Sequence, residues 1–109
     1  MNFFEVGEVV FGGGNLAFIL GPCVVENEEH SLYMAGEIAR AARNAGVRFI
    51  YKSSFDKANR SSIDSFRGSG MEFGLSVLSK VKQEFSVPVL TDIHEPWQAA
   101  EAANVADIL

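Results

Sequence analysis

The sequence predicts an α/β fold in which helices cover a parallel sheet. Three times along the chain, a short apolar run leads into a polar loop and then into a segment with the apolar spacing of a helix. The apolar runs are continuous rather than alternating, which is typical of parallel strands buried on both faces. With 109 residues and 48% apolar content, the chain has the size and composition of one globular domain.

Composition also excludes several classes of protein. The formal net charge of -5 argues against a nucleic-acid-binding or acidic-membrane-binding protein, because such partners select a basic face. Cys23 is the single cysteine, so no intramolecular disulfide can form, and a reducing cytoplasmic compartment is expected. The early apolar run 16–20 is too short to cross a bilayer, so we expect neither a signal peptide nor a membrane span.

The chain opens with two predicted strands, residues 3–11 and 16–20, joined by a glycine-rich turn at 12–15. No Lys-Ser/Thr pair follows the glycines and no helical pattern begins there. The run therefore indicates a turn rather than a phosphate-binding loop.

In the first strand-loop-helix unit, residues 17–20 run into Gly21-Pro22-Cys23, where Gly and Pro end the strand. A helix follows, with Asn27 as its predicted N-cap and Gly46 as its end. Its predicted inward face consists of Leu32, Ala35, Ile38, Ala39 and Ala42.

The second unit comprises a strand at 47–51, a polar loop at 52–67 and a helix at 71–85. The helix has apolar residues at helical spacing, namely Met71, Leu75, Leu78, Val81 or Lys82, and Phe85.

The third unit begins with a strand at 87–90 and a polar cluster at 91–95. Pro96 suits the first turn of a helix, whose predicted inward face is Trp97, Ala100 and Ala103. Residues 105–109 then begin a fourth strand.

Polar residues follow all three strands, as in a (β/α)8 TIM barrel, whose active site is drawn from successive strand ends. A doubly wound sheet would usually carry a glycine fingerprint after its first strand. A TIM barrel needs about 250 residues, and a short parallel sheet would leave unpaired edges. We therefore predict that residues 1–109 form the amino-terminal part of a single TIM-barrel catalytic domain. They would supply a hairpin that plugs the amino-terminal end, three βα units and the start of a fourth strand, and would be inactive and poorly soluble alone.

The loop at 52–67 carries four of the nine Lys and Arg residues of this acidic chain. Lys52, Lys57 and Arg60 alternate with Ser and Asn side chains, a mixture that suits phosphate and carboxylate groups. A solvated surface loop is the alternative interpretation.

Two further positions are candidates for chemistry. Asp92 and His94 lie two residues apart, so in an extended segment their side chains point the same way and could polarise a substrate group and hold a proton. A capping Asp and a surface His would explain the pair equally well. Cys23 follows a strand end and could be a metal ligand or nucleophile, or a small buried side chain. A metal needs three or four ligands, and no other His or Cys nearby in the sequence completes a site.

Three motifs together resemble the 3-deoxy-D-manno-octulosonate-8-phosphate synthase family (2-dehydro-3-deoxyphosphooctonate aldolase): Gly21-Pro22-Cys23, the run KSSFDKANRSSIDSFRG from Lys52 to Gly68, and Thr91-Asp92-Ile93-His94-Glu95-Pro96. The resemblance covers essentially the whole chain and a little under half of a family member. It implies a TIM barrel, usually a homotetramer, that condenses phosphoenolpyruvate with D-arabinose 5-phosphate and releases inorganic phosphate in lipopolysaccharide sugar biosynthesis.

The resemblance also implies roles for individual residues. Cys23 matches the metal-dependent class and would be one ligand of a divalent ion such as Zn, Fe or Mn, with a His, a Glu and an Asp from later strands. Lys57, Asp92 and His94 would be catalytic, with Lys57 between the two substrates and Arg67 ordering the loop. The implied substrate contacts are Lys52, Ser54 and Lys57 for phosphoenolpyruvate, and Asn59, Arg60, Ser61 and Asp92 for the sugar phosphate, with Arg60-Ser61 reaching across a subunit interface.

The sequence is also compatible with two other functions. A 3-deoxy-D-arabino-heptulosonate-7-phosphate synthase-like enzyme would share the barrel, phosphoenolpyruvate and the cysteine. Its loop typically reads Lys-Pro-Arg-Thr, from which Lys52-Ser53-Ser54-Phe55 departs. The other possibility is a non-catalytic phosphosugar-binding fragment.

Overall fold

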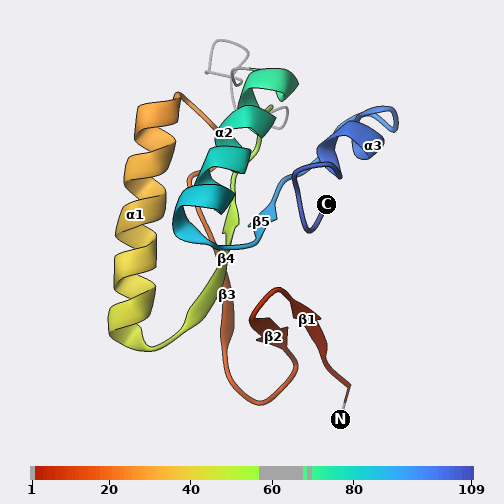
Figure 1. The fold of residues 1–109 in the computed structure, drawn as a ribbon. Coiled ribbons are helices and arrows are strands. Elements are labelled where there is room, and N and C mark those ends of the chain that lie inside the picture. The colour runs from red at the N-terminus through yellow and green to blue at the C-terminus, as the bar shows by residue number, and fades with distance from the viewer. Residues whose placement is uncertain (1, 57–67, 69) are drawn as a thin grey trace.

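The opening segment forms a compact antiparallel hairpin. The computed structural model describes residues 2–56, 68 and 70–109, and in it β1 (Phe4–Val6) pairs with β2 (Val9–Phe11) (Figure 1). The prediction of one strand over 3–11 is wrong, because the chain reverses within it at Gly7-Glu8. Gly7 has φ 59°, and a two-residue hairpin loop needs a positive φ that glycine readily adopts. Residues 12–15 lead from the hairpin into the parallel sheet.

The parallel sheet has the sequential order β3-β4-β5, with β3 at Ala17–Leu20, β4 at Arg48–Lys52 and β5 at Val89–Leu90. Leu20 pairs with Tyr51, and Tyr51 with Val89. The predicted strands are therefore confirmed, with their bounds shifted by one or two residues.

The end of the chain extends this order by one position. Ile108 forms an isolated parallel bridge with Leu90, and the Thr91 N–H donates to the Ile108 carbonyl at 3.3 Å. The predicted fourth strand is thus present only as this single bridge. In a doubly wound sheet of the 3-2-1-4 type, the fourth strand returns to the other side of the first. Here it follows the third, as in a barrel, although the described residues form no closed barrel.

The first helix begins and ends where the sequence predicts. Helix α1 spans Glu28–Ala45; the Asn27 side chain accepts a hydrogen bond from the His30 N–H at 2.7 Å. Gly46 adopts the left-handed conformation with φ 71°, and its N–H points back to the carbonyls of Ala42 and Arg43. Local capping chemistry therefore fixes both ends.

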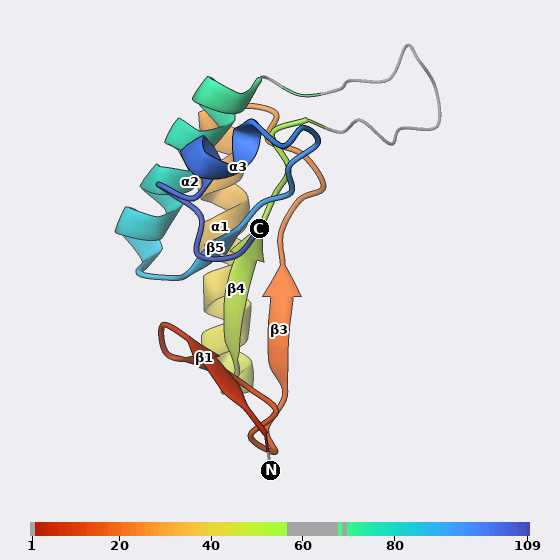
Figure 2. The same cartoon turned by 90° about the vertical axis from the view of Figure 1, so that its right-hand side faces the viewer.

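Helices α1 and α2 (Met71–Phe85) cover one face of the parallel sheet (Figure 2). Phe49 and Tyr51 of β4 pack against both helices, and the predicted inward faces are confirmed, with Val81 rather than Lys82 buried. Burial raises the pKa of Tyr51 to about 12, so its hydroxyl stays protonated. Each fully buried aliphatic side chain here contributes about 1.5–3 kcal/mol. The buried cluster comprises Ala35, Ala42, Phe49, Tyr51, Leu75, Leu78, Val81, Val89 and Ala102.

The third helix is shorter than expected, and its predicted inward face is wrong. Helix α3 spans Gln98–Ala102, and it buries these two end residues while Trp97 is 65% exposed. The Gln98 side chain accepts hydrogen bonds from the N–H groups of His94 and Glu95 at 2.8 and 3.0 Å. Because this polar contact holds Gln98 inward, the helix is rotated away from the apolar face that the spacing predicts.

The hairpin lies at the amino-terminal ends of the parallel strands, as predicted (Figure 2). Val9 is buried, Glu8 pairs with Arg48 of β4 at 2.6 Å, and Gly7 approaches Pro88. The opposite, carboxyl-terminal ends remain for the polar loops. None of the helices in the described part of the chain is long and apolar enough to cross a membrane.

We predict that Asn27→Ala lowers the free energy of unfolding by about 1 kcal/mol, because the His30 N–H loses its acceptor at the start of α1. Denaturant unfolding measures this change, with Asn27→Asp as the control that keeps a side-chain acceptor. Equal losses in both variants would contradict the capping role.

Candidate functional site

The residues predicted to carry chemistry follow three neighbouring parallel strands, so their backbones meet at one edge of the sheet (Figure 2). The Ser54 N–H donates to the Cys23 carbonyl at 3.1 Å, and the Val25 N–H donates to the Ser54 carbonyl at 2.8 Å. On the other side, the Ser53 N–H donates to the Leu90 carbonyl at 3.3 Å. The structure therefore brings the segments bearing Cys23, Lys52 and Asp92 together.

A close backbone approach sets the spacing between the first two segments. A Cβ atom on Gly21 would overlap the carbonyl oxygen of Lys52. Glycine is required here for space rather than for a positive φ. The Gly-Pro pair before Cys23 thus does more than end the strand: it lets β3 approach β4 where the polar loops begin.

Two hydroxyl residues that sequence reasoning missed connect the three strand ends. Ser53 and Thr91 are both 0% exposed. The Ser53 hydroxyl donates to the Pro22 carbonyl at 2.9 Å, and the Thr91 hydroxyl donates to the Ser53 carbonyl at 2.9 Å. In the sequence, the only indication of this role is that a hydroxyl residue stands one or two positions after each of two predicted strands.

The two described residues of the basic loop that were predicted to bind phosphoenolpyruvate differ in exposure. Lys52 is exposed at the end of β4, whereas Ser54 is 4% exposed. The Ser54 hydroxyl donates to the Asp56 carbonyl at 2.8 Å and accepts the Asp56 N–H at 3.0 Å. Its proton is therefore used within the loop, and a contact with substrate stays a prediction. The other predicted residues of this loop, Lys57, Asn59, Arg60, Ser61 and Arg67, lie outside the described residues.

Asp92 and His94 lie close together, as their spacing predicts. Asp92 Oδ2 is 3.5 Å from His94 Nε2, and Asp92 Oδ1 is buried without a hydrogen-bond partner among the described residues. The ring of Phe55 meets the imidazole edge-on, with centroids 5.9 Å apart. A carboxylate beside an imidazole can orient the ring. The pair therefore places an acid-base side chain next to a carboxylate at this edge of the sheet.

Cys23 is exposed at the end of the first parallel strand. Within the described residues, no group of three His, Cys, Asp or Glu side chains is placed to hold a metal ion. These residues alone therefore do not complete a metal centre, and metal binding by Cys23 stays a prediction.

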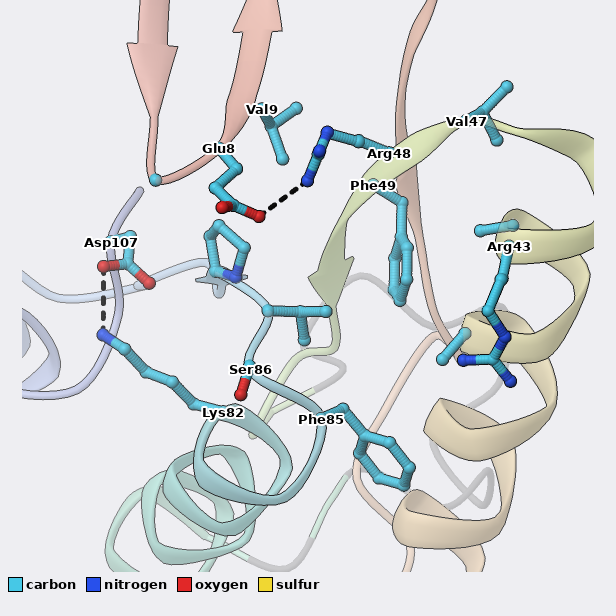
Figure 3. A pocket seen from close by; sticks show the side chains of 15 residues that line it. Glu8, Val9, Arg43, Val47, Arg48, Phe49, Lys82, Phe85, Ser86 and Asp107 are labelled. Atoms are coloured by element: carbon cyan, nitrogen blue, oxygen red, sulfur yellow. Dashed lines mark hydrogen bonds and ion pairs between the residues drawn. The ribbon is translucent and has the colours of Figure 1, made fainter.

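A large cavity, bigger than the one at the carboxyl-terminal edge, lies at the opposite end of the strands (Figure 3). It has a volume of about 670 Å³ and lies between the hairpin and the ends of α1 and α2. The ion pairs Glu8–Arg48 and Lys82–Asp107 flank it, with their charges directed at each other. A smaller cavity of about 310 Å³ lies at the carboxyl-terminal edge, lined partly by Phe55, Asp56 and Trp97. Size alone therefore does not mark the candidate site.

Known proteins match the chain over nearly its whole length. The model of the DAHP synthetase I family matches residues 3–109. A protein of Fusobacterium nucleatum named 2-dehydro-3-deoxyphosphooctonate aldolase is 51% identical over 110 residues, covering 100% of this chain and 40% of the relative. A protein of the same name from Francisella tularensis subsp. novicida is 52% identical over 106 residues, covering 96% of this chain and 38% of the relative. Another from Synechococcus sp. is 55% identical over 106 residues, covering 97% of this chain and 36% of the relative. The chain thus spans about 40% of the length of such relatives.

We predict that Gly21→Ala destabilises the protein by about 3 kcal/mol, because the new methyl group forces β3 away from Lys52. Gly36→Ala is the control: it lies within α1, where the added methyl would meet the Phe85 ring at an ordinary 3.4 Å and helix propensity favours alanine. Denaturant unfolding compares the two. Equal stability of both variants would show that the strand ends can separate freely.

Proposed function

Because the chain belongs to the DAHP synthetase I family, we propose that it is the amino-terminal part of a 3-deoxy-D-manno-octulosonate-8-phosphate synthase. The full-length enzyme would condense phosphoenolpyruvate with D-arabinose 5-phosphate and release inorganic phosphate, in lipopolysaccharide sugar biosynthesis. The observation that carries this proposal is that the described parts of three family-like motifs meet at one edge of the sheet, supported by relatives named 2-dehydro-3-deoxyphosphooctonate aldolase at 51–55% identity.

The proposed architecture is a closed TIM barrel. The sequential strand order and the bridge from Leu90 to Ile108 support it, because each new parallel strand is added beside the last. Ile19 and Leu20 of β3 are 45% and 38% exposed, which leaves apolar surface for further strands to cover. We also propose a cytoplasmic homotetramer, in keeping with the family resemblance and the lone cysteine.

In the proposed reaction, C3 of phosphoenolpyruvate attacks the aldehyde carbon of the sugar phosphate and forms the new carbon-carbon bond. Water then adds at C2, and cleavage of the C–O bond releases phosphate. The two substrates bring several negative charges into one cleft, which Lys52, Lys57 and Arg60 offset locally. Lys52 and Ser54 would hold phosphoenolpyruvate with Lys57, and Asn59, Arg60 and Ser61 would hold the sugar phosphate. Asp92 would accept hydrogen bonds from sugar hydroxyls, and His94 would carry a proton beside it.

We further propose that Cys23 is one ligand of a divalent metal ion in the full-length protein. A thiolate is a ligand that Zn and Fe accept, and Cys23 is exposed at the edge where the substrates would meet. In keeping with the family resemblance, the remaining ligands would come from residues after 109; the described part of the chain holds no group of three His, Cys, Asp or Glu side chains placed to bind a metal.

The rival enzyme would use erythrose 4-phosphate in place of arabinose 5-phosphate. The family description names that class of enzyme, whereas the relatives given above are all named for the octulosonate reaction. The segment Lys52-Ser53-Ser54-Phe55 also differs from the Lys-Pro-Arg-Thr of the rival. Both observations favour the arabinose 5-phosphate reaction.

We predict that the full-length protein releases phosphate from phosphoenolpyruvate with a kcat/KM about 100-fold higher for arabinose 5-phosphate than for erythrose 4-phosphate. A phosphate-release assay with each sugar measures the ratio. Preference for erythrose 4-phosphate would favour the rival enzyme, and binding of both substrates without phosphate release would favour a non-catalytic binding protein.

We predict that Cys23→Ala in the full-length protein weakens metal binding by more than about 100-fold, since a direct ligand is lost. Elemental analysis of protein purified in parallel measures bound metal. The control is Asn104→Ala, which changes an exposed polar residue after α3 and should leave the metal content unchanged. Stoichiometric metal in Cys23→Ala, or full activity of metal-free wild type, would contradict the assignment.

A further inference from the structure

Two buried hydroxyl groups join residues that are adjacent in sequence to the candidate site residues. The Ser53 hydroxyl donates a hydrogen bond to the carbonyl of Pro22, the residue before Cys23. The carbonyl of Ser53 accepts the hydroxyl of Thr91, the residue before Asp92. Ser53 itself lies directly after Lys52. A single chain of hydrogen bonds thus runs across all three strand ends, one residue away from each candidate side chain.

The sheet ladder explains why hydroxyl groups occur here. The regular pairing of β4 with β5 ends at Lys52 and Leu90, and that of β3 with β4 at Leu20 and Tyr51. Beyond those pairs the strands turn into loops, and buried carbonyls without a partner would be costly. In this structure the side-chain hydroxyls of Ser53 and Thr91 supply donors to two of these carbonyls.

The two hydroxyls also restrict movement between segments. Ser53 is bonded to both neighbours, because its N–H donates to the Leu90 carbonyl at 3.3 Å on one side and its hydroxyl donates to Pro22 on the other. Both Ser53 and Thr91 are 0% exposed, so water has little access to their hydroxyl groups, and the bond from Thr91 to Ser53 is fully buried. A displacement of Cys23 or Asp92 relative to Lys52 would have to break at least one of them.

We propose that Ser53 and Thr91 are positioning residues that fix the relative placement of Cys23, Lys52 and Asp92. The hydroxyls do not contact substrate themselves; they act through the three loops that they join. The effect on catalysis rests on the proposed function, because only a reaction between two aligned substrates would depend on this spacing. A misplacement of the reacting groups by about 1 Å can lower a rate about 100-fold.

The variants distinguish the effect of losing a hydroxyl group from the effects of changing the side chain's shape or altering any buried serine. Thr91→Val keeps the shape and removes the donor to Ser53, whereas Thr91→Ser keeps the hydroxyl and removes a methyl group. Ser53→Ala removes the donor to Pro22. Ser31→Ala is the matched control, because Ser31 is also 0% exposed but its hydroxyl has no hydrogen-bond partner among the described residues.

Two measurements on the full-length protein test the proposal. Hydrogen exchange of the Val25, Ser53 and Ser54 amides measures how often the strand ends open, and this measurement does not depend on the reaction. We expect exchange roughly five-fold faster in Thr91→Val and Ser53→Ala, with Ser31→Ala and Thr91→Ser close to wild type. Steady-state kinetics with phosphoenolpyruvate and arabinose 5-phosphate tests whether the site residues are still correctly placed for the reaction. We expect kcat to fall about tenfold in Thr91→Val and to recover in Thr91→Ser.

Unchanged exchange in Thr91→Val and Ser53→Ala would overturn the proposal, because the hydroxyls would not hold the strand ends. Faster exchange with unchanged kcat would also overturn it and leave the hydroxyls a role in stability alone. If wild type fails to turn over the two substrates, the proposed function falls, and hydrogen exchange alone decides whether the hydroxyls fix the strand ends. If Thr91→Val does not fold, hydrogen exchange and steady-state kinetics are compared between Ser53→Ala, which loses a hydroxyl, and Thr91→Ser, which keeps one.

Discussion

Three parallel strands end side by side in this structure, and the backbone groups beyond their last ladder bonds still require partners. The hydroxyls of Ser53 and Thr91 supply donors there, and Gly21 lets the backbones come close enough for these bonds to form. The helices depend on the same sheet, since Tyr51 of β4 anchors the core that α1 and α2 cover. The edge that carries the candidate chemistry is therefore built directly on the most buried part of the fold.

The two ends of the parallel sheet differ in how their charged side chains are arranged. At the amino-terminal end the hairpin packs through Val9, and the pairs Glu8–Arg48 and Lys82–Asp107 direct their charges at each other around the larger cavity. At the carboxyl-terminal end Lys52 is exposed and Cys23 is accessible. Arg43 also lines the larger cavity, so positive charge alone does not distinguish the two ends. The carboxyl-terminal edge is favoured because the active sites of TIM barrels lie at the carboxyl ends of the strands.

Sequence reasoning succeeded where local chemistry decides the structure. Asn27 and Gly46 end α1 through contacts within a few residues, so their roles could be read from the sequence. The hairpin inside the predicted strand 3–11 was not predicted because a single glycine, Gly7, suffices for a two-residue turn, whereas the longer glycine run after β2 connects the hairpin to the sheet. The inward face of α3 depends on the Gln98 side chain reaching back to a preceding loop, which apolar spacing does not encode.

The candidate site was predictable to a similar degree. Parallel strands bring Cys23, Lys52 and Asp92 to one edge, and the order of strands and loops was sufficient to predict that convergence. The parts played by Ser53 and Thr91 were not predictable, because a hydroxyl residue after a strand is as compatible with a solvated loop as with complete burial, and only the packing of the neighbouring strands decides between them.

The most direct test of the central claim is a crystal structure of the full-length protein with phosphoenolpyruvate bound. We predict density for the ligand at the carboxyl-terminal edge of the sheet, within hydrogen-bond distance of Lys52 Nζ, with the hydrogen bonds from Ser53 to Pro22 and from Thr91 to Ser53 both intact. Density for phosphoenolpyruvate in the cavity between the hairpin and the ends of α1 and α2, with the carboxyl-terminal edge empty, would contradict it.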